Sequence, residues 1–410
     1  MNYQSAVFQM HTRRWTQKEF LFFLAYGLYL IGAVWDISFF QIQYGGIAYK
    51  WVLFAVAVIL ILKECFPVDD IRRSVIVGAV TFACLAAVFL SHDHDLILNP
   101  VTWIMIFVFT ARDVEFRKIA DFTLKLGSLL FIITVVCSGI GIIRNYVEIG
   151  GGRTRHYLGF KYALYPSVFL SNLTALAIWL KKDQMPWRGL IAFAVLNLLI
   201  FSLTDARLAV MLCLLMIFGA AALKWRHARK SKKSPKRHGR MLAFAFVFCM
   251  ILSVGATLAY SNNVPWQSKL NLKLGHRLEL GQDSLQSHGV RPFGEAIKMS
   301  GNALNDKGHR DLSKTHGVYN YVDCMYIQML QNFGWVLTAL LIATMTLALW
   351  RAYQKGDTYL LMIGGVLALH GIIDDLILNV YQNTFWLILA FLVIRPLVES
   401  VRHARQAKQQ

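Results

Sequence analysis

Charged residues are scarce in this chain. Asp, Glu, Lys and Arg make up 16% of its 410 residues, whereas a soluble domain contains about 25%. Acidic residues are the scarcer kind, with 23 against 42 Lys and Arg, so the formal net charge is +19. Hydrophobic residues make up 56% of the chain, and the mean hydropathy is +0.47. This composition excludes an ordinary soluble domain and predicts an all-α, polytopic membrane protein.

The cysteines do not predict a disulfide framework. Four of the six cysteines fall inside apolar runs, and the chain has no Cys-x-x-Cys motif and no His/Cys cluster. We therefore expect no structural disulfide, no bound metal and no cofactor. Internal repeats and a separate soluble domain are also missing, so we predict one integral-membrane domain over residues 1–410.

Apolar runs of about 16–20 residues recur along the chain, close to the length that a helix needs to cross ~30 Å of hydrocarbon. They predict twelve transmembrane helices. The first follows basic residues without a small-residue cleavage site, so it is interpreted as a retained helix. The predicted spans are 19–40, 47–62, 74–90, 96–110, 124–143, 163–180, 188–204, 206–223, 241–260, 322–350, 358–378 and 380–395.

The distribution of Lys and Arg predicts the orientation. With both termini in the cytoplasm, 28 of the 42 Lys and Arg residues fall on the inside and 13 on the outside, as the positive-inside rule expects. The external cations are confined to loop 144–161, Arg207 and the long external loop 261–321. Because membrane insertion does not need cations outside, we expect these to have another role.

The densest basic block is the cytoplasmic linker 224–240. We interpret it as a topology signal that is also attracted to anionic lipid, so the net charge does not indicate nucleic-acid binding.

Loop 144–161 contains Gly150-Gly-Gly-Arg153-Thr-Arg155-His156-Tyr-Leu-Gly-Phe. Glycines allow the backbone to approach a ligand closely, and guanidinium groups suit phosphate. The motif therefore predicts a phosphate site formed by Arg153 and Arg155. A flexible basic turn that faces lipid headgroups is the alternative.

The tight turn Thr204-Asp205-Ala-Arg207 joins two spans. Asp205 and Arg207 either neutralise each other at the tip of the turn, or Arg207 points into a polar cavity and binds an anion.

The long external loop 261–321 is rich in His and Arg, and it alternates polar and apolar residues around Arg277 and Arg291. We expect short helices or turns at the membrane surface. A lone histidine in such a loop, including the candidate base His316, is more often solvated than catalytic.

Four further side chains near the last spans are candidates. Asp323 and Tyr326 are three residues apart and would share one face at a helix start, although a carboxylate there also suits the helix dipole. His370 and Asp374 are four apart on the eleventh span, as a functional pair or as a structural hydrogen bond.

Taken in order, the Gly/Arg loop, the Thr-x-x-Arg turn and a long loop ending in Asp323-x-x-Tyr-x-x-x-Leu-x-x-x-Gly334 resemble the bacterial surface-polysaccharide polymerases of the Wzy type. These belong to one superfamily with the O-antigen ligases. The resemblance extends over roughly 144–340. Asp323 and Cys324 stand where the ligases have a His-Asn pair, which favours a polymerase.

The resemblance implies a metal-independent glycosyltransferase of the bacterial cytoplasmic membrane with its active site facing outside. Its substrate would be an oligosaccharide linked to undecaprenyl pyrophosphate, and its protein partners a flippase and a chain-length regulator. Arginines would neutralise the leaving pyrophosphate, and Asp323 or His316 would act as general base on the acceptor hydroxyl, with inversion. The binding arginines would be Arg153, Arg155, Arg207, Arg277 and Arg291, with Tyr326, Asp205, His370 and Asp374 in support. A lipid-linked oligosaccharide flippase and a glycan ligase are the alternatives.

Overall fold

The computed structural model describes residues 15–45, 48–65, 98–150, 152–229, 236–305, 307–309 and 319–399. The predicted span 74–90 and the candidate base His316 lie outside these residues, so both stay predictions.

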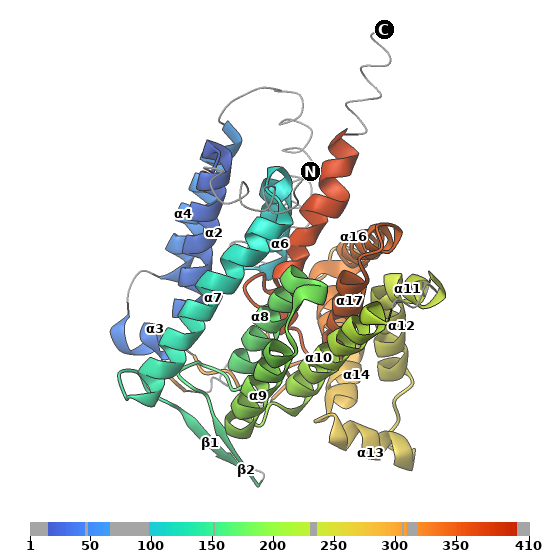
Figure 1. The fold of residues 1–410 in the computed structure, drawn as a ribbon. Helices are drawn as coiled ribbons and strands as arrows, with labels where there is room; N and C mark the ends of the chain where they lie inside the picture. Colours follow the sequence, from blue (N-terminus) through green and yellow to red (C-terminus); the bar gives the residue numbers. More distant parts are fainter. Residues whose placement is uncertain are drawn as a thin grey trace.

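The described residues are mostly helical, and their longer helices run side by side as a bundle (Figure 1). The α-helices are α2 (Gln17–Asp36), α3 (Phe39–Tyr44), α4 (Tyr49–Cys65), α6 (Pro100–Thr110), α7 (Phe116–Gly139), α8 (Tyr165–Lys181), α9 (Trp187–Thr204), α10 (Arg207–Ala228), α11 (Lys236–Ala243), α12 (Ala245–Leu258), α13 (Pro265–Lys273), α14 (Arg277–His288), α15 (Met325–Gln328), α16 (Gly334–Gln354) and α17 (Thr358–Ile373). The strands are β1 (Val147–Gly150) and β2 (Arg153–His156). The π-helices are η5 (Met329–Phe333) and η8 (Ala390–Ile394), and the 3-10 turns are η2 (Ala111–Asp113), η3 (Lys182–Gln184), η6 (Leu376–Leu378) and η7 (Thr384–Leu387).

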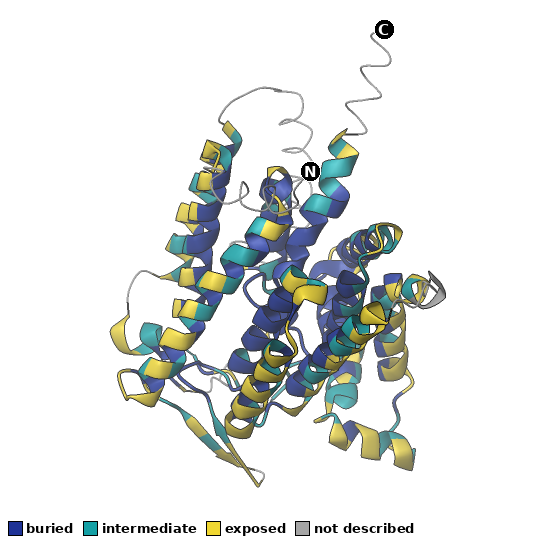
Figure 2. Cartoon of the chain, in the orientation of Figure 1, coloured by how far each residue is buried: buried dark blue, intermediate teal, exposed yellow. Residues whose placement is uncertain are grey.

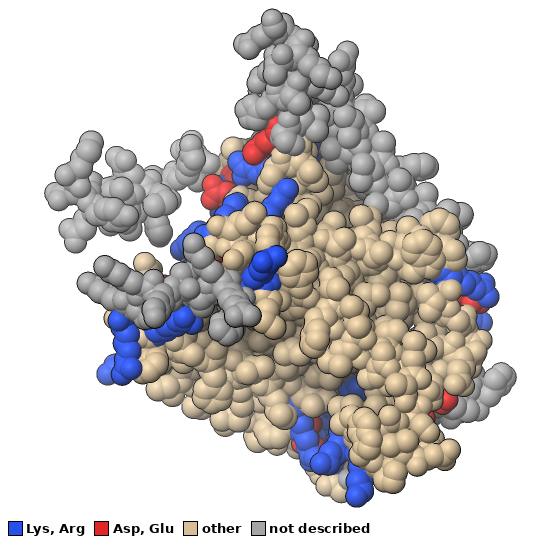
Figure 3. Space-filling model, turned by 90° about the vertical axis from the view of Figure 1, so that its right-hand side faces the viewer, with Lys and Arg blue, Asp and Glu red and all other residues tan. Residues whose placement is uncertain are grey.

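Five helical stretches in the described residues are long and apolar enough to cross a membrane: α2, α7, α9, α10 and the continuous stretch Met325–Gln354. The apolar helices α12 and α17 are shorter. Only 22% of the apolar window of α9 is buried, and exposed residues line the outward sides of α9 and α10 (Figure 2). In Figure 3 the charged atoms lie at the upper left, along the left and right edges and at the bottom of the face shown, and uncharged side chains cover a broad area in the middle. These features confirm an α-helical membrane protein.

Two predicted spans are shorter than expected. The predicted span 96–110 becomes α6, which begins at Pro100 because the Asn99 side chain accepts the backbone N–H of Val101 and proline suits a first turn. The span 241–260 becomes α12 with 14 residues, and a break at Phe244 separates it from α11. The basic linker is also partly helical at both of its ends, since α10 extends to Ala228 and α11 begins at Lys236.

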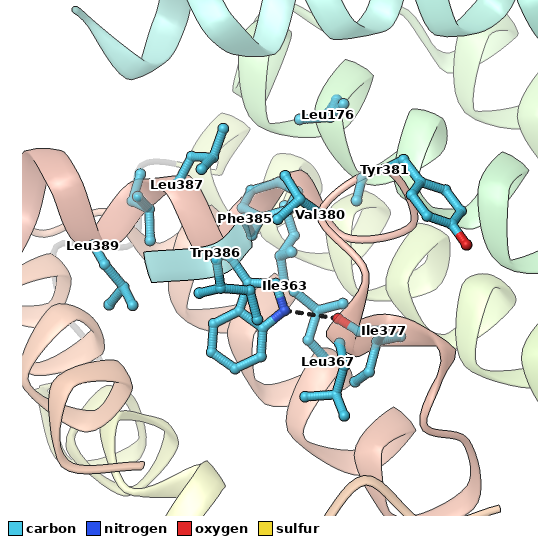
Figure 4. Packing of buried hydrophobic residues seen from close by; sticks show 14 of the residues in the cluster. Leu176, Ile363, Leu367, Ile377, Val380, Tyr381, Phe385, Trp386, Leu387 and Leu389 are labelled. Carbon is cyan, nitrogen blue, oxygen red and sulfur yellow. Dashed lines mark hydrogen bonds between the residues drawn. The ribbon is translucent and has the colours of Figure 1, made fainter. Parts of the chain in front are cut away.

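The last two predicted spans are interrupted by irregular backbone. α17 ends at Ile373, and residues 374–387 contain only the 3-10 turns η6 and η7 before helix resumes. Trp386 is fully buried there, and its indole N–H donates to the carbonyl oxygen of Ile377 at 2.7 Å (Figure 4). Irregular backbone at membrane depth is tolerated only where protein surrounds it or where it lines a cavity. Apolar side chains fill this segment, which is why hydropathy predicted the uninterrupted spans 358–378 and 380–395.

The tenth span begins later than the predicted 322, with α15 at Met325, and it passes through η5. Gly334 ends this π-helical turn with φ +79°, and a Cβ there would lie 2.2 Å from the carbonyl oxygen of Pro292. The backbone N–H of Glu295 donates to the carbonyl oxygen of Gln331 at 2.8 Å. Loop 291–297 is thereby docked onto the π-helix, and glycine is required at position 334 for both reasons.

The two predicted polar loops are more ordered than an irregular chain. Val147–Gly150 and Arg153–His156 form an antiparallel hairpin in which Gly150 pairs with Arg153. Loop 261–321 contains α13 and α14, which confirms the predicted short helices. The hairpin and α13 lie at the lower end of the bundle in Figure 1.

Candidate active site

Asp323 lies in an irregular segment just before the apolar helical stretch Met325–Gln354, which is long enough to cross a membrane. Its neighbours Val322 and Cys324 are buried, and the carbonyl oxygen of Val322 accepts the Nε2–H of Gln328 at 2.9 Å. The backbone N–H of Cys324 also donates to the carbonyl oxygen of Val322 at 2.8 Å, so the chain turns tightly at Asp323 between two buried neighbours. The prediction that Asp323 and Tyr326 share a helical face is therefore wrong, because the helix begins only at Met325.

The Asp323 carboxylate pairs with Arg277 from the start of α14. The Nη2 atom of Arg277 lies 3.3 Å from Oδ2 of Asp323, and the two side chains are 18% and 13% exposed. The Nη1 atom of Arg277 also donates to the carbonyl oxygen of Leu274 at 2.6 Å. The long loop therefore delivers a cation from one of its helices to the carboxylate at its own end.

Burial raises the pKa of Asp323 from 3.8 to about 6. The positive charge of Arg277 opposes that rise, the negative charge of Asp374 adds to it, and Arg155 again opposes it. A carboxyl group with a pKa near 6 is mostly ionised at pH 7 and binds a proton more readily than an ordinary aspartate. These are the properties of a general base.

Two more buried carboxylates, Asp374 and Asp375, follow the end of α17. The Tyr321 hydroxyl donates to Oδ2 of Asp375 at 2.7 Å, which links this pair to the Asp323 segment. The Nε2 atom of His370 lies 3.8 Å from Oδ2 of Asp374. This places the predicted His370–Asp374 pair at the same carboxylate cluster.

Arg155 reaches toward this cluster from β2. Its Nε–H donates to the carbonyl oxygen of Thr204 at 3.1 Å, and its Nη1 lies 3.6 Å from Oε2 of Glu148. Tyr162 is also close enough to the cluster to feel its charge. Burial raises the pKa of Tyr162 well above the usual value of 10, and the negative charges of Asp323 and Asp374 raise it further. Tyr162 therefore keeps its proton at neutral pH and can donate a hydrogen bond.

Two more of the predicted phosphate-binding arginines gather on one carboxylate. Nε of Arg207 lies 2.9 Å from Oδ1 of Asp205, and Nε of Arg153 lies 3.3 Å from Oδ2. Their side chains are 56% and 47% exposed. Asp205 adopts a left-handed conformation with φ +48°, which turns the chain tightly between α9 and α10. The structure thus shows the Asp205–Arg207 pairing, and anion binding by Arg207 stays a prediction.

The remaining candidates lie apart from Asp323. Arg291 pairs with Glu295 at 2.9 Å on the surface, and the buried Tyr326 donates its hydroxyl to the carbonyl oxygen of Ala368 at 2.8 Å, which ties α15 to α17. His276 stands just before α14, and its Nδ1 lies 2.9 Å from Oε2 of Glu279. The histidines at positions 288 and 309 are exposed.

Sequence reasoning missed Tyr162, Tyr321 and Glu148 as parts of the site. Tyr162 comes directly after the Gly/Arg loop, and Tyr321 stands two residues before Asp323, so nearness to a motif was the available signal. Within the described residues, no group of three or more His, Cys, Asp or Glu side chains is arranged to hold a metal ion.

The site thus combines a carboxylate able to accept a proton, a tyrosine able to donate a hydrogen bond, and guanidinium groups at the same end of the bundle. No protein-family model matches the chain, and neither a curated protein nor a solved structure was found to be similar to it.

Proposed function

We propose that the chain is a polysaccharide polymerase, a glycosyltransferase that moves a growing glycan from undecaprenyl pyrophosphate to the non-reducing-end hydroxyl of a fresh lipid-linked repeat. The observation that carries the proposal is the buried Asp323, whose pKa is raised to about 6 by burial beside Arg277 at 3.3 Å. The sequence resemblance supplies the class of substrate.

The reaction is a single displacement. The acceptor hydroxyl oxygen attacks the anomeric carbon of the growing chain, the bond from that carbon to the pyrophosphate oxygen breaks, and the hydroxyl proton passes to Asp323. Undecaprenyl pyrophosphate leaves with the bonding electrons, and the anomeric configuration inverts. Arg153, Arg155 and Arg207 neutralise the charge that develops on the leaving group.

The proposal includes a topology. Twelve spans with both termini in the cytoplasm put the hairpin, the turn at Asp205 and the Asp323 end at the outer face of the bacterial cytoplasmic membrane, in agreement with the Lys and Arg distribution. A flippase would supply the lipid-linked repeats there, and a chain-length regulator would act on the growing polymer.

Glycans from a strain that lacks the gene test the proposal against its two alternatives. A polymerase predicts single lipid-linked repeats stranded on the outside, whereas a flippase predicts repeats left on the cytoplasmic side. A ligase predicts long lipid-linked chains. Gel analysis of surface and lipid-linked glycans separates these outcomes, and full-length polymer in the deletion strain would contradict all three.

A further inference from the structure

A polar cleft of about 320 Å³ has Asp375, the hydrogen-bond partner of Tyr321, in its wall. Its polar walls come from separate parts of the chain: Asn99 before α6, Gln328 of α15, Asn332 of η5, and Asp375 and Asn379 after α17. Binding pockets for small molecules span about 300–1,000 Å³, so this cleft suits one small polar group rather than a lipid chain.

The backbone around the cleft departs from regular α-helix on two sides. Asn332 belongs to the π-helix η5, and Asn379 belongs to the irregular segment 374–387. π-Helical turns frequently occur at functional sites, and irregular backbone in a membrane bundle is tolerated where it lines a cavity. The cleft is where these two interruptions meet.

The Asp375 carboxylate points to what the cleft binds. Its residue is 8% exposed, and while Oδ2 accepts the Tyr321 hydroxyl, Oδ1 is buried without a hydrogen-bond partner. An unpaired buried acceptor costs about 1–3 kcal/mol, and a ligand hydroxyl would remove that cost.

The neighbouring carboxamides add donors and acceptors on the same walls, while Pro100 and Phe333 supply apolar surface. A ligand with several adjacent hydroxyls and an apolar face matches this lining. One sugar residue has this chemistry.

We propose that this cleft binds one sugar residue, with Oδ1 of Asp375 accepting a hydroxyl and the carboxamides of Asn332 and Asn379 fixing its orientation. That this sugar belongs to the acceptor end of a lipid-linked glycan rests on the proposed function. Tyr321 bonds Asp375 and stands two residues before Asp323, so this hydrogen bond connects the wall of the cleft to the segment that carries the candidate base.

Binding is tested with the full-length protein in lipid nanodiscs by saturation-transfer NMR. The probes are the methyl glycosides of glucose, galactose, N-acetylglucosamine and rhamnose. At least one should receive saturation from the wild-type protein. The exposed Ala296 lines the cleft from the docked loop, so Ala296→Trp should block the cleft without disturbing the core. Asn379→Leu should remove a polar wall, and both changes should weaken binding by about tenfold or more.

Asn263→Leu is the matched control, because Asn263 is exposed and outside the cleft, and it should bind as the wild type does. Absence of saturation with every glycoside, or equal saturation in Ala296→Trp and Asn379→Leu, would overturn the inference.

Polymer assays on the same variants distinguish a failure of the cleft inference from a failure of the proposed function. If Asp323→Asn abolishes polymer while Ala296→Trp leaves it at the wild-type level, the cleft inference alone is wrong. If Asp323→Asn makes polymer normally, the polymerase proposal is wrong, and the glycoside result still decides whether the cleft binds sugar.

Discussion

The guanidinium of Arg277 lies 3.3 Å from the carboxylate of Asp323, and both side chains are less than one-fifth exposed. Arg277 begins α14 inside the long loop, whereas Asp323 ends that loop. Because charges interact more strongly away from bulk water, the positive charge of Arg277 lowers the pKa of Asp323. A partly buried ion pair is weak evidence of a stabilising role, so its consequences are best sought in activity.

Replacing Asp323 by asparagine should abolish most polymerisation. The amide keeps the shape of the side chain but cannot take the acceptor proton, and a positioned general base contributes about 10²- to 10⁴-fold to a rate. Polymer synthesis from purified lipid-linked repeats measures the effect. Asp283→Asn, at an exposed carboxylate on α14, is the control and should retain wild-type activity. Equal activity in the two variants would exclude Asp323 as the base.

The polymerisation rate should depend on pH through Asp323. Burial raises its pKa to about 6, and the base must be deprotonated, so the rate should rise about tenfold per pH unit below 6 and level off above about 7. The measurement is the initial rate of the purified protein between pH 5 and 8. A rate that falls as pH rises through this range would contradict the assignment.

Arg277→Gln should move that inflection to higher pH. The positive charge of Arg277 lowers the pKa of Asp323, so its removal leaves burial and Asp374 to raise the pKa further. Arg277→Lys should restore much of the wild-type profile, since it returns the charge. Lys273→Gln, an exposed cation on the neighbouring α13, should leave the inflection in place. A shift of the inflection to lower pH in Arg277→Gln would contradict this prediction.

Arg153→Ala and Arg207→Ala should each reduce polymerisation by about 10- to 100-fold, the effect expected from losing a hydrogen bond to a charged group. Their side chains are about half exposed and share Asp205, and surface ion pairs contribute little to stability. The unfolding temperature should therefore stay at the wild-type value while activity falls. Full-length polymer from both variants at normal expression would refute a role in binding the pyrophosphate.

Gly334→Ala should destabilise the protein by about 2 kcal/mol or more, because the side chain would meet both an unfavourable φ and the Pro292 carbonyl. Thermal unfolding of the detergent-purified protein measures it. Gly255→Ala is the matched control, since a Cβ at this position in α12 meets nothing within 4 Å. It should be neutral or slightly stabilising. An unchanged unfolding temperature in Gly334→Ala would show that loop 291–297 is free to move away from η5.

Several elements could be predicted because lipid imposes a simple requirement. A helix that crosses hydrocarbon needs a long apolar run, so composition alone located α2, α9 and α10 to within about five residues. The helix α7 begins at Phe116, before the predicted start at 124, because its first turns carry charged residues. The exceptions have specific causes. Asn99 and Pro100 start α6 late, and the apolar residues around Trp386 have the hydropathy of a span while forming buried irregular backbone.

The candidate site was predictable in its residue types and less so in its pairings. Loop composition singled out Asp323, Arg155, Arg207 and Arg277, but periodicity put Asp323 on a helix that in fact begins at Met325. Tyr162 and Tyr321 carried no sequence signal beyond their nearness to motifs, because a tyrosine in a membrane protein is ordinary until its neighbours are known.

The sequence by itself determined the class of this protein and where its polar groups enter the chain, because hydrophobic length and charge distribution are local properties. Only the tertiary structure decided that Arg277 pairs with Asp323, that Arg153 of the hairpin pairs with Asp205, and that Asp375 lines a cleft. These are contacts between segments distant in the chain. They depend on how the helices pack and where their backbone breaks, which no local pattern encodes.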